Sequence, residues 1–120
     1  MSATILVVDD VHAFRELVVE IIASEGYRVL ETDSAEAALE ILSEEGIDLV
    51  LTDVVMPGGM NGFEVADQAL AIDPKLKVLL ATGYASGGAA VNRAALNRYP
   101  MLRKPYSLEV LAQTLRTLLE

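Results

Sequence analysis

The segment LVLTDVVMPGG, residues 49–59, joins a run of apolar residues to a loop rich in proline and glycine. Its apolar part is short and nearly continuous, as in strands of a parallel sheet that are buried on both faces. Asp53 stands where this predicted strand, residues 47–52, ends and the loop begins. An aspartate in such a place is a turn residue about as often as a reactive one, so its role depends on what the other strand ends contribute.

The remainder of the chain alternates apolar runs with segments of helical period. Strands are predicted over residues 5–8, 28–32, 78–81 and 101–102 in addition to residues 47–52. Helices are predicted around the apolar stripes of residues 14–22, 35–42 and 108–118, over residues 63–72, and over residues 85–98. Five strands that alternate with five helices predict an α/β domain, an open and doubly wound parallel sheet with helices on both faces.

Local signals mark the ends and the inner faces of these helices. Asp33 with Glu36 resembles a capping box at the start of the second helix, and Ser107 can cap the last one. Leu17 belongs to the apolar stripe of the first helix, and Leu108 to that of the last. Both leucines are therefore expected to face the core.

Length and composition limit the possible functions. The chain has 120 residues, which suits a single domain over residues 1–120. A net charge of −9 argues against nucleic-acid binding, because phosphate backbones attract clusters of lysine and arginine. The absence of cysteine excludes disulfides, thiolate metal sites and a cysteine nucleophile. Without a basic leader or an apolar run of about 18 residues, we expect a cytoplasmic protein with no membrane span.

Polar side chains follow four of the five predicted strands. Asp9 and Asp10 follow the first strand, and Asp53, Thr82 and Lys104 follow the third, fourth and fifth. Each alone has an ordinary explanation as a helix cap, a turn residue or a solvated charge. The carboxyl ends of the strands form the ligand crevice of an open parallel sheet, so these side chains are expected to converge. Four strand ends that each supply a suitable group favour one common site.

The chemistry that uses this set of groups is phosphoryl transfer to a carboxylate. Three carboxylates held together repel one another unless they share a cation, and oxygen ligands select a hard ion such as Mg²⁺. An ionised carboxylate is itself a nucleophile and can form an aspartyl phosphate without a general base. Lys104 can neutralise phosphoryl charge, and the Thr82 hydroxyl can donate a hydrogen bond to a phosphoryl oxygen. The single histidine, His12, is expected on a helix surface.

Four segments carry a resemblance to a known family. ILVVDD (5–10), DLVLTDVVMPGGMNG (48–62), LLATGY (79–84) and LRKPY (102–106) resemble the signature segments of the response-regulator receiver domain of two-component signalling. The resemblance covers essentially the whole chain, in the family's order and spacing. It implies the flavodoxin-like (βα)5 fold with strand order 2-1-3-4-5. It also implies a signalling phosphoacceptor rather than an enzyme, phosphorylated by a histidine kinase or a histidine phosphotransfer protein.

The resemblance assigns a role to each matched position. Asp53 matches the phosphoacceptor, Thr82 the switch hydroxyl and Lys104 the phosphate-contacting lysine, which a cis proline usually follows, here Pro105. The implied Mg²⁺ ligands are Asp9, Asp10, Asp53 and the backbone carbonyl of Val55, with Asp9 usually acting through water.

The chain departs from the common family pattern at several positions. Gly58 and Gly59 lengthen the loop after the proline, and Asn61 replaces the commoner aspartate, as in receivers attached to hybrid sensor kinases. Met101 stands where an aromatic residue often swings with the switch hydroxyl, and Tyr84 either takes over part of that gating or lies on the loop surface. The resemblance also implies that Val55 and Tyr84 border the path of an attacking water, and their bulk without an acid or amide group predicts slow loss of the phosphoryl group.

Other classes of protein fit the sequence less well. A small-molecule phosphatase also uses an aspartate nucleophile and Mg²⁺, but it usually needs a second acid shortly after the nucleophile, where this chain has Val54 and Val55. A nucleotide- or flavin-binding module would have a glycine- or hydroxyl-rich loop after the first strand. A receiver-like domain that only binds partners would not need the complete acidic site. Residues 85–119 are the face expected for partners or for a receiver–receiver dimer.

Overall fold

The computed structural model describes residues 3–55, 60–82, 99–104 and 106–119. The elements in chain order are β1 (Thr4–Val8), α1 (His12–Ser24), β2 (Arg28–Thr32), α2 (Ala35–Glu44), β3 (Leu49–Asp53), α3 (Gly62–Ile72), β4 (Lys77–Thr82), β5 (Met101–Arg103) and α5 (Leu108–Leu119). Each predicted strand and four of the predicted helices are found close to their expected places. The helix predicted over residues 85–98 lies outside the described residues.

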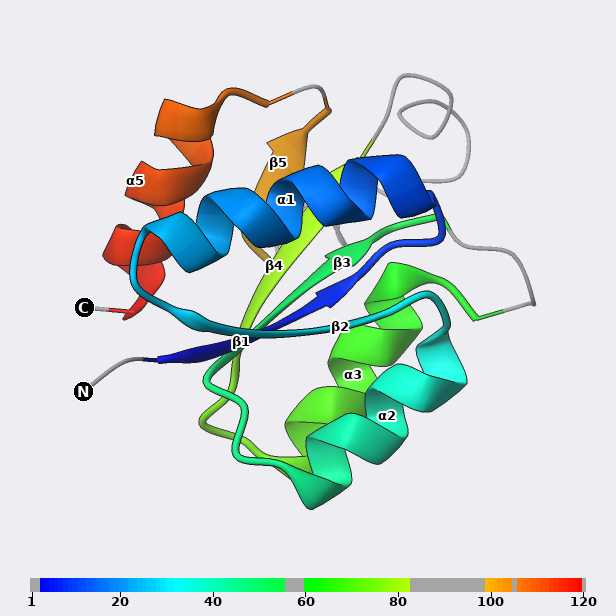
Figure 1. Ribbon diagram of the computed structural model, residues 1–120. Helices are drawn as coiled ribbons and strands as arrows, with labels where there is room; N and C mark the ends of the chain where they lie inside the picture. The colour runs from blue at the N-terminus through cyan, green and yellow to red at the C-terminus, as the bar shows by residue number, and fades with distance from the viewer. Residues whose placement is uncertain (1–2, 56–59, 83–98, 105, 120) are drawn as a thin grey trace.

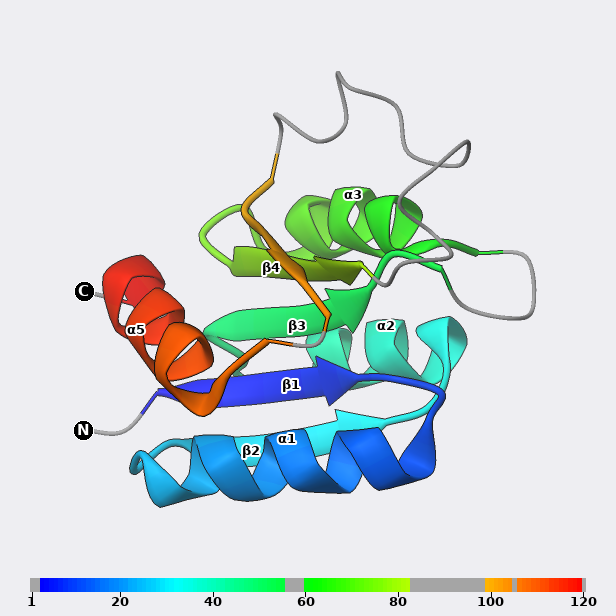
Figure 2. The ribbon, with the colours of Figure 1, turned by 90° about the horizontal axis from the view of Figure 1, so that it is seen from above.

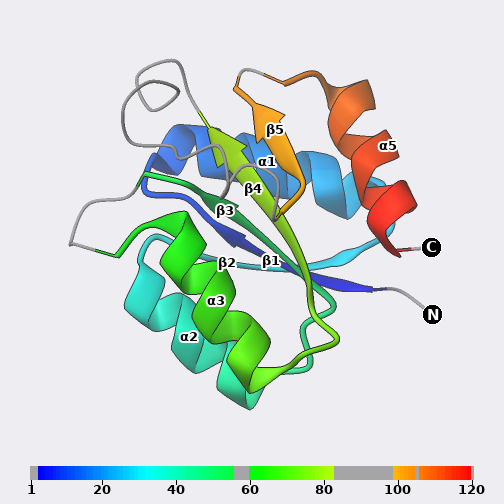
Figure 3. The same cartoon turned by 180° about the vertical axis from the view of Figure 1, so that it is seen from behind.

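The strands form one parallel sheet with the order β2-β1-β3-β4-β5. Figure 2 shows the succession from β2 to β4, and Figure 3 shows β5 beside β4. The first strand pairs with both β2 and β3, so it occupies the interior of the sheet although it comes first in the sequence. The chain therefore winds outward from β1 in both directions, and the predicted order is confirmed. Val8 lies opposite Thr52, which brings the residues after β1 and the end of β3 side by side.

Helices cover both faces of the sheet, with α1 and α5 on one face and α2 and α3 on the other (Figures 1 and 3). Successive residues of a strand point to opposite faces, and both faces of β1 are buried. Leu6 and Val8 pack under α2 and α3, whereas Ile5 and Val7 pack under α1 and α5. Burial on both sides explains why these strands read as continuous apolar runs.

Two leucines that were expected in the core lie on the surface instead. Leu17 is 53% exposed and Leu108 is 51% exposed. Neighbouring positions on a helix are about 100° apart, so Val18, which is fully buried in α1, turns Leu17 toward the edge of the helix. Leu108 begins α5, one turn before the buried Leu111.

The predicted cap of α2 is wrong by one residue. The N-cap is Ser34, whose Oγ accepts a hydrogen bond from the Ala37 amide at 3.2 Å, and Asp33 lies outside the helix. Either residue type can cap a helix, so the pattern alone leaves the choice open by one position. The predicted cap of α5 is confirmed, because Ser107 Oγ accepts from the Val110 amide at 3.1 Å.

Candidate functional site

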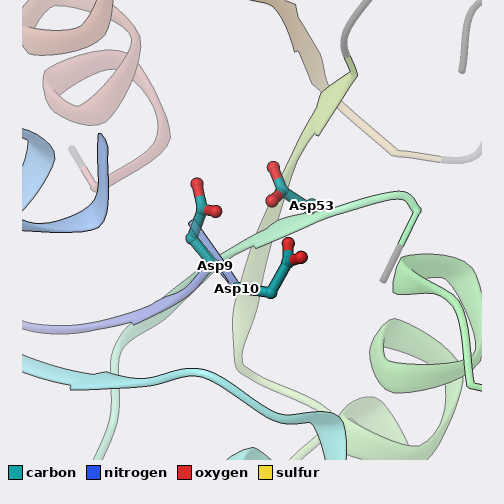
Figure 4. Close-up of side chains that lie close together, drawn as sticks. All are labelled: Asp9, Asp10 and Asp53. Atoms are coloured by element: carbon teal, nitrogen blue, oxygen red, sulfur yellow. The ribbon is translucent and has the colours of Figure 1, made fainter. Parts of the chain in front are cut away.

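The carboxyl ends of β1 and β3 bring three aspartates together. Asp9, Asp10 and Asp53 each offer a carboxylate oxygen, and these oxygens lie within 4.8 Å of one another (Figure 4). The parallel pairing of β1 with β3 produces this cluster, because Asp9 follows Val8 and Asp53 follows Thr52 in the paired register. The predicted convergence of the acidic residues is therefore present in the structure.

The two neighbouring aspartates after β1 differ in their surroundings. Asp9 is buried, its Oδ1 accepts a hydrogen bond from the Val11 amide at 2.9 Å, and its Oδ2 lies 3.0 Å from Lys104 Nζ. Asp10 is exposed, and within the described residues its carboxylate has no hydrogen-bond or ion-pair partner. Asp9 thus holds the local backbone and the lysine, whereas Asp10 keeps both oxygens available for a ligand.

Lys104 supplies the positive charge of the site. Its Nζ lies 2.6 Å from Asp53 Oδ1 as well as 3.0 Å from Asp9 Oδ2. The backbone reaches this place through β5, where the Lys104 amide donates to the Thr82 carbonyl at 2.7 Å. Burial by itself lowers the pKa of Lys104, but the hydrogen bonds and charges of Asp53 and Asp9 outweigh it and raise that pKa. The ammonium group therefore stays charged at neutral pH.

One aromatic ring contacts the lysine, and a second ring packs against the first. Lys104 Nζ lies 4.5 Å from the centroid of the Phe14 ring, a cation–π contact from α1. The Tyr106 ring packs against Phe14 at a centroid separation of 5.7 Å, and burial, followed by the charges of Asp53 and Asp9, raises the Tyr106 pKa well above its usual range. This role of Phe14 is not predicted by the sequence, in which Phe14 is one residue of the apolar stripe of the first helix. The contact with Lys104 could not be predicted from the sequence, because it depends on how α1 packs near the end of β5.

Asp53 is an unusually basic carboxylate in this site. Its pKa is raised from 3.8 to about 7, first by burial and also by the hydrogen bond and charge of Asp9, while Lys104 lowers it. The nearby ammonium group therefore does not offset the combined effect of burial and of the Asp9 carboxylate. An added cation among these oxygens would lower the Asp53 pKa and keep the carboxylate ionised.

The backbone around Asp53 is held by α3. The Val54 amide donates to the Ala81 carbonyl at 2.9 Å, and the Gly62 amide donates to the Val54 carbonyl at 2.7 Å. A Cβ at position 62 would overlap the Asp53 carbonyl, so only glycine allows this approach. Asn61 and Glu64 form a capping box that starts α3 at this place. Asparagine followed three residues later by glutamate is the sequence signal that would have found this cap.

The other predicted site residues lie along the same edge of the sheet. Thr82 ends β4 opposite Arg103, and Val55 follows β3 with its side chain 52% exposed. Met101 is partly buried against the core cluster that α2 and α3 cover.

His12 begins α1 with its side chain 70% exposed, as expected of a surface residue. Tyr84, Gly58, Gly59 and Pro105 lie outside the described residues.

The donor set of the cluster fits a hard divalent cation. Its three candidate ligand atoms are all carboxylate oxygens, and two of the carboxylates are buried beside a single lysine. Mg²⁺ prefers one or two carboxylates, further oxygen ligands and retained water, and the exposed Asp10 side leaves room for water. The same arrangement presents a buried, basic carboxylate next to an ammonium group, as transfer of an anionic group to Asp53 would require.

The chain belongs to the response regulator receiver domain family. Residues 5–116 match the model of that family. The fold agrees, because the receiver domain of the hybrid histidine kinase CckA has a TM-score of 0.81 at 28% identity, covering 98% of this chain and 100% of that one. The flavodoxin-like fold and the resemblance to receivers of hybrid kinases are thereby confirmed. The assignment of all of residues 1–120 to one domain stays a prediction.

Curated relatives include proteins of different architecture. The chain is 40% identical over 121 residues to the sensor kinase CckA of Brucella abortus (strain 2308), covering 99% of this chain but 13% of the kinase. It is 36% identical over 115 residues to the response regulator receiver protein CpdR of the same organism, covering 96% of this chain and 95% of that protein. The family is a phosphoacceptor in two-component signalling, and both kinases and stand-alone receivers carry such a domain. No helix in the described part of the chain is long and apolar enough to cross a membrane.

Proposed function

We propose that Asp53 accepts a phosphoryl group in a Mg²⁺-dependent reaction and that Thr82 and Lys104 couple this event to a change of conformation. The observation that carries the proposal is that three carboxylates each place an oxygen within 4.8 Å of the others, while Lys104 forms ion pairs with two of these carboxylates. A structural ion pair would need only one carboxylate for one lysine. The excess negative charge suits a site that binds a cation.

Asp9, Asp10, Asp53 and the Val55 carbonyl would hold the Mg²⁺, which when bound supplies positive charge for the carboxylates and for phosphoryl oxygens. Asp9 already uses Oδ1 for the Val11 amide, which suits contact through water. Asp10 has both oxygens available among the described residues, which suits direct ligation. Val55 directly follows the buried Val54 at the end of β3, where its carbonyl belongs to the same edge.

In the proposed transfer, an oxygen of the ionised Asp53 carboxylate attacks the phosphorus of a phosphohistidine. The new bond joins that oxygen to phosphorus, and the bond from phosphorus to the histidine nitrogen breaks, so the electron pair returns to the imidazole. Lys104 Nζ, 2.6 Å from Asp53 Oδ1, would then contact the phosphoryl oxygens in place of the carboxylate. The Thr82 hydroxyl would donate to another phosphoryl oxygen from the end of β4.

The phosphoryl group is proposed to leave slowly. Hydrolysis needs a water aligned opposite the Asp53 oxygen, and the exposed Val55 side chain at this edge has no polar group to orient one. Val55→Asn, which adds an amide at this position, is expected to speed phosphate release from the phosphorylated domain. An unchanged decay rate in this variant and in Tyr84→Glu would contradict the shielding role.

The proposed donors are a histidine kinase or a histidine phosphotransfer protein in the cytoplasm. The similarity to a sensor kinase and to a response regulator receiver protein supports a donor from two-component signalling without naming the cognate partner. A receiver–receiver dimer through residues 85–119 stays a prediction. Of that face, β5 and α5 are described, and Val110 on α5 is 46% exposed.

The proposed function is tested with acetyl phosphate and Mg²⁺. Asp53→Asn should abolish incorporation of hydroxylamine-labile phosphate, while Asp48→Asn, the same change at the other end of β3, should leave it intact. Lys104→Ala should retain some incorporation but lose the change in amide NMR shifts that phosphorylation produces in the parent. Incorporation that survives Asp53→Asn would exclude Asp53 as the acceptor.

A further inference from the structure

The guanidinium group of Arg15 joins three parts of the fold directly behind the acidic cluster. Arg15 lies in the first turn of α1, yet its side chain is only 12% exposed. Its Nη1 donates to the Asp9 carbonyl at 2.7 Å, and its Nε donates to Glu31 Oε1 on β2 at 2.8 Å. Its Nη2 lies 2.9 Å from His12 Nδ1, and His12 Nε2 lies 3.1 Å from Glu16.

These contacts fix the guanidinium plane in more than one direction. The donors of an arginine form a rigid planar fork, so the contact of Nε with β2 and that of Nη1 with the segment after β1 together set the orientation of the group. Glu31 is the anionic partner on β2, and the Asp9 carbonyl is a neutral acceptor on the segment that follows β1. The arginine therefore bridges the ends of two adjacent strands.

The bonded carbonyl has a particular importance for the site. It belongs to the peptide group that links Asp9 to Asp10, so the hydrogen bond from Arg15 restrains the backbone of Asp10. On its other side the same segment is held by the bond from the Val11 amide to Asp9 Oδ1. The Asp10 carboxylate is exposed and has no side-chain partner within the described residues, so the backbone is the part of Asp10 that these contacts hold in place.

We infer that Arg15, oriented by Glu31, is a positioning residue that sets the place of Asp10 in the Mg²⁺ site. This inference rests on the proposed function, because it assumes that Asp10 binds the metal. Groups that orient metal ligands without touching the metal typically change metal affinity about 10- to 100-fold when they are removed. Arg15 acts on a ligand's backbone, so we expect an effect near the lower end of that range.

Charge alone would change the Mg²⁺ affinity in the opposite direction. Removing a positive charge near an acidic cluster reduces repulsion of a cation, so a variant without the Arg15 charge would bind Mg²⁺ more tightly if charge alone mattered. A positioning role predicts weaker binding in spite of that gain. The direction of the change in affinity therefore separates the two effects, which a measurement of stability could not do.

The test is a titration of the full chain with Mg²⁺ alone, followed by backbone amide NMR shifts, which report both affinity and an intact fold. Arg15→Met should bind Mg²⁺ about tenfold more weakly than the parent. Arg15→Lys should recover part of the affinity, because an ammonium group can donate to the Asp9 carbonyl but cannot also hold Glu31 in the same geometry. Glu31→Gln, which keeps Arg15 and weakens only its ionic partner, should show a smaller loss and serves where Arg15→Met does not fold.

Arg116→Met is the matched control. Arg116 forms an ion pair with Glu25 at 3.1 Å, which joins the carboxyl ends of α5 and α1. The Arg116→Met variant therefore loses one positive charge and one carboxylate partner, as Arg15→Met does, but away from the acidic cluster. It should keep the parent's affinity for Mg²⁺. Equal or tighter binding by Arg15→Met and by Glu31→Gln would overturn the inference while the parent still binds. A parent that binds no Mg²⁺, or an Asp10→Ala variant that binds as the parent does, would overturn the proposed metal site and this inference with it.

Discussion

The two ends of β3 carry the same residue types in opposite roles. At the amino end, Asp48 is exposed, and its Oδ2 accepts a hydrogen bond from the Thr4 amide at 2.8 Å, which ties β3 to β1. At the carboxyl end, Asp53 is buried and faces Asp9, Asp10 and Lys104. The glycines differ in the same way, since a Cβ on Gly46 would meet nothing within 4 Å, whereas one on Gly62 would overlap the Asp53 carbonyl.

The aspartate at the amino end of β3 has a structural role, whereas the one at the carboxyl end belongs to the candidate site. The amino-end carboxylate is satisfied by a backbone amide and needs no further partner. The carboxyl-end carboxylate is surrounded by other charges, and its pKa is raised to about 7 by burial first and by Asp9 next. Parallel strands place all their carboxyl ends on one edge, so charge accumulates there and not at the opposite edge.

Matched substitutions of the two aspartates should give the largest contrast in stability. Below pH 3.8 Asp53 is protonated in both the folded and the unfolded chain, and between pH 3.8 and about 7 only the unfolded chain readily loses the proton. The parent is therefore destabilised as the pH rises through this window. Without divalent ions, Asp53→Asn should be more stable than the parent at pH 8 by about 2–4 kcal/mol, from about 1.4 kcal/mol for each unit of pKa.

The pH profile is the check on that prediction. Urea unfolding from pH 4 to pH 8 should show the advantage of Asp53→Asn growing with pH, whereas Asp48→Asn should stay within about 0.5 kcal/mol of the parent throughout. An advantage that shrinks as the pH rises would mean that the Asp53 charge is well accommodated in the folded chain.

The two glycines give the next contrast. Gly62→Ala should cost about 1–3 kcal/mol of stability, because the added methyl group forces α3 and the Asp53 carbonyl apart. Gly46→Ala should be neutral or slightly stabilising, since it meets no atom and restricts the unfolded chain. Thermal unfolding of both variants measures this difference, and equal effects would show that α3 moves without cost.

The next smaller contrast is the stabilisation that Mg²⁺ gives to variants at the two edges of the sheet. At a Mg²⁺ concentration about ten times the dissociation constant, the parent should gain about 1.4 kcal/mol of stability. Asp10→Ala should lose this gain, because Asp10 belongs to the oxygen cluster. Asp48→Asn should retain it, because Asp48 lies outside that cluster. Melting curves with and without Mg²⁺ decide the matter, and a full gain in Asp10→Ala would contradict its role as a ligand.

The smallest expected effect concerns the aromatic support of Lys104. Phe14→Leu removes the ring that lies 4.5 Å from Lys104 Nζ, whereas Phe63→Leu makes the same change against the core cluster covered by α2 and α3. A cation–π contact of about 0.5–1 kcal/mol corresponds to a two- to fivefold slower phosphorylation by acetyl phosphate. Initial rates for the two variants measure it, and equal slowing in both would assign the effect to core packing.

Much of this arrangement could be predicted from the residues. The continuous apolar runs identify buried parallel strands, and the polar residues after them identify the edge that carries the site. The contacts of Phe14 and Arg15 could not be predicted, because they depend on how α1 lies against β2 and on where Lys104 returns after β5. The predicted cap at Asp33 is misplaced because aspartate and serine are both suitable cap residues, and the predicted place of Leu17 is wrong because neighbouring positions on a helix point in different directions.

The proposed function requires that Asp53, and no other aspartate of the cluster, becomes phosphorylated. Borohydride reduction of an aspartyl phosphate converts that residue to homoserine, which peptide mass spectrometry locates in the chain. After treatment of the parent with acetyl phosphate and Mg²⁺, we expect homoserine at position 53 alone, and none after the same treatment of Asp53→Asn. Homoserine at position 9, 10 or 48, or homoserine anywhere in treated Asp53→Asn, would contradict Asp53 as the acceptor.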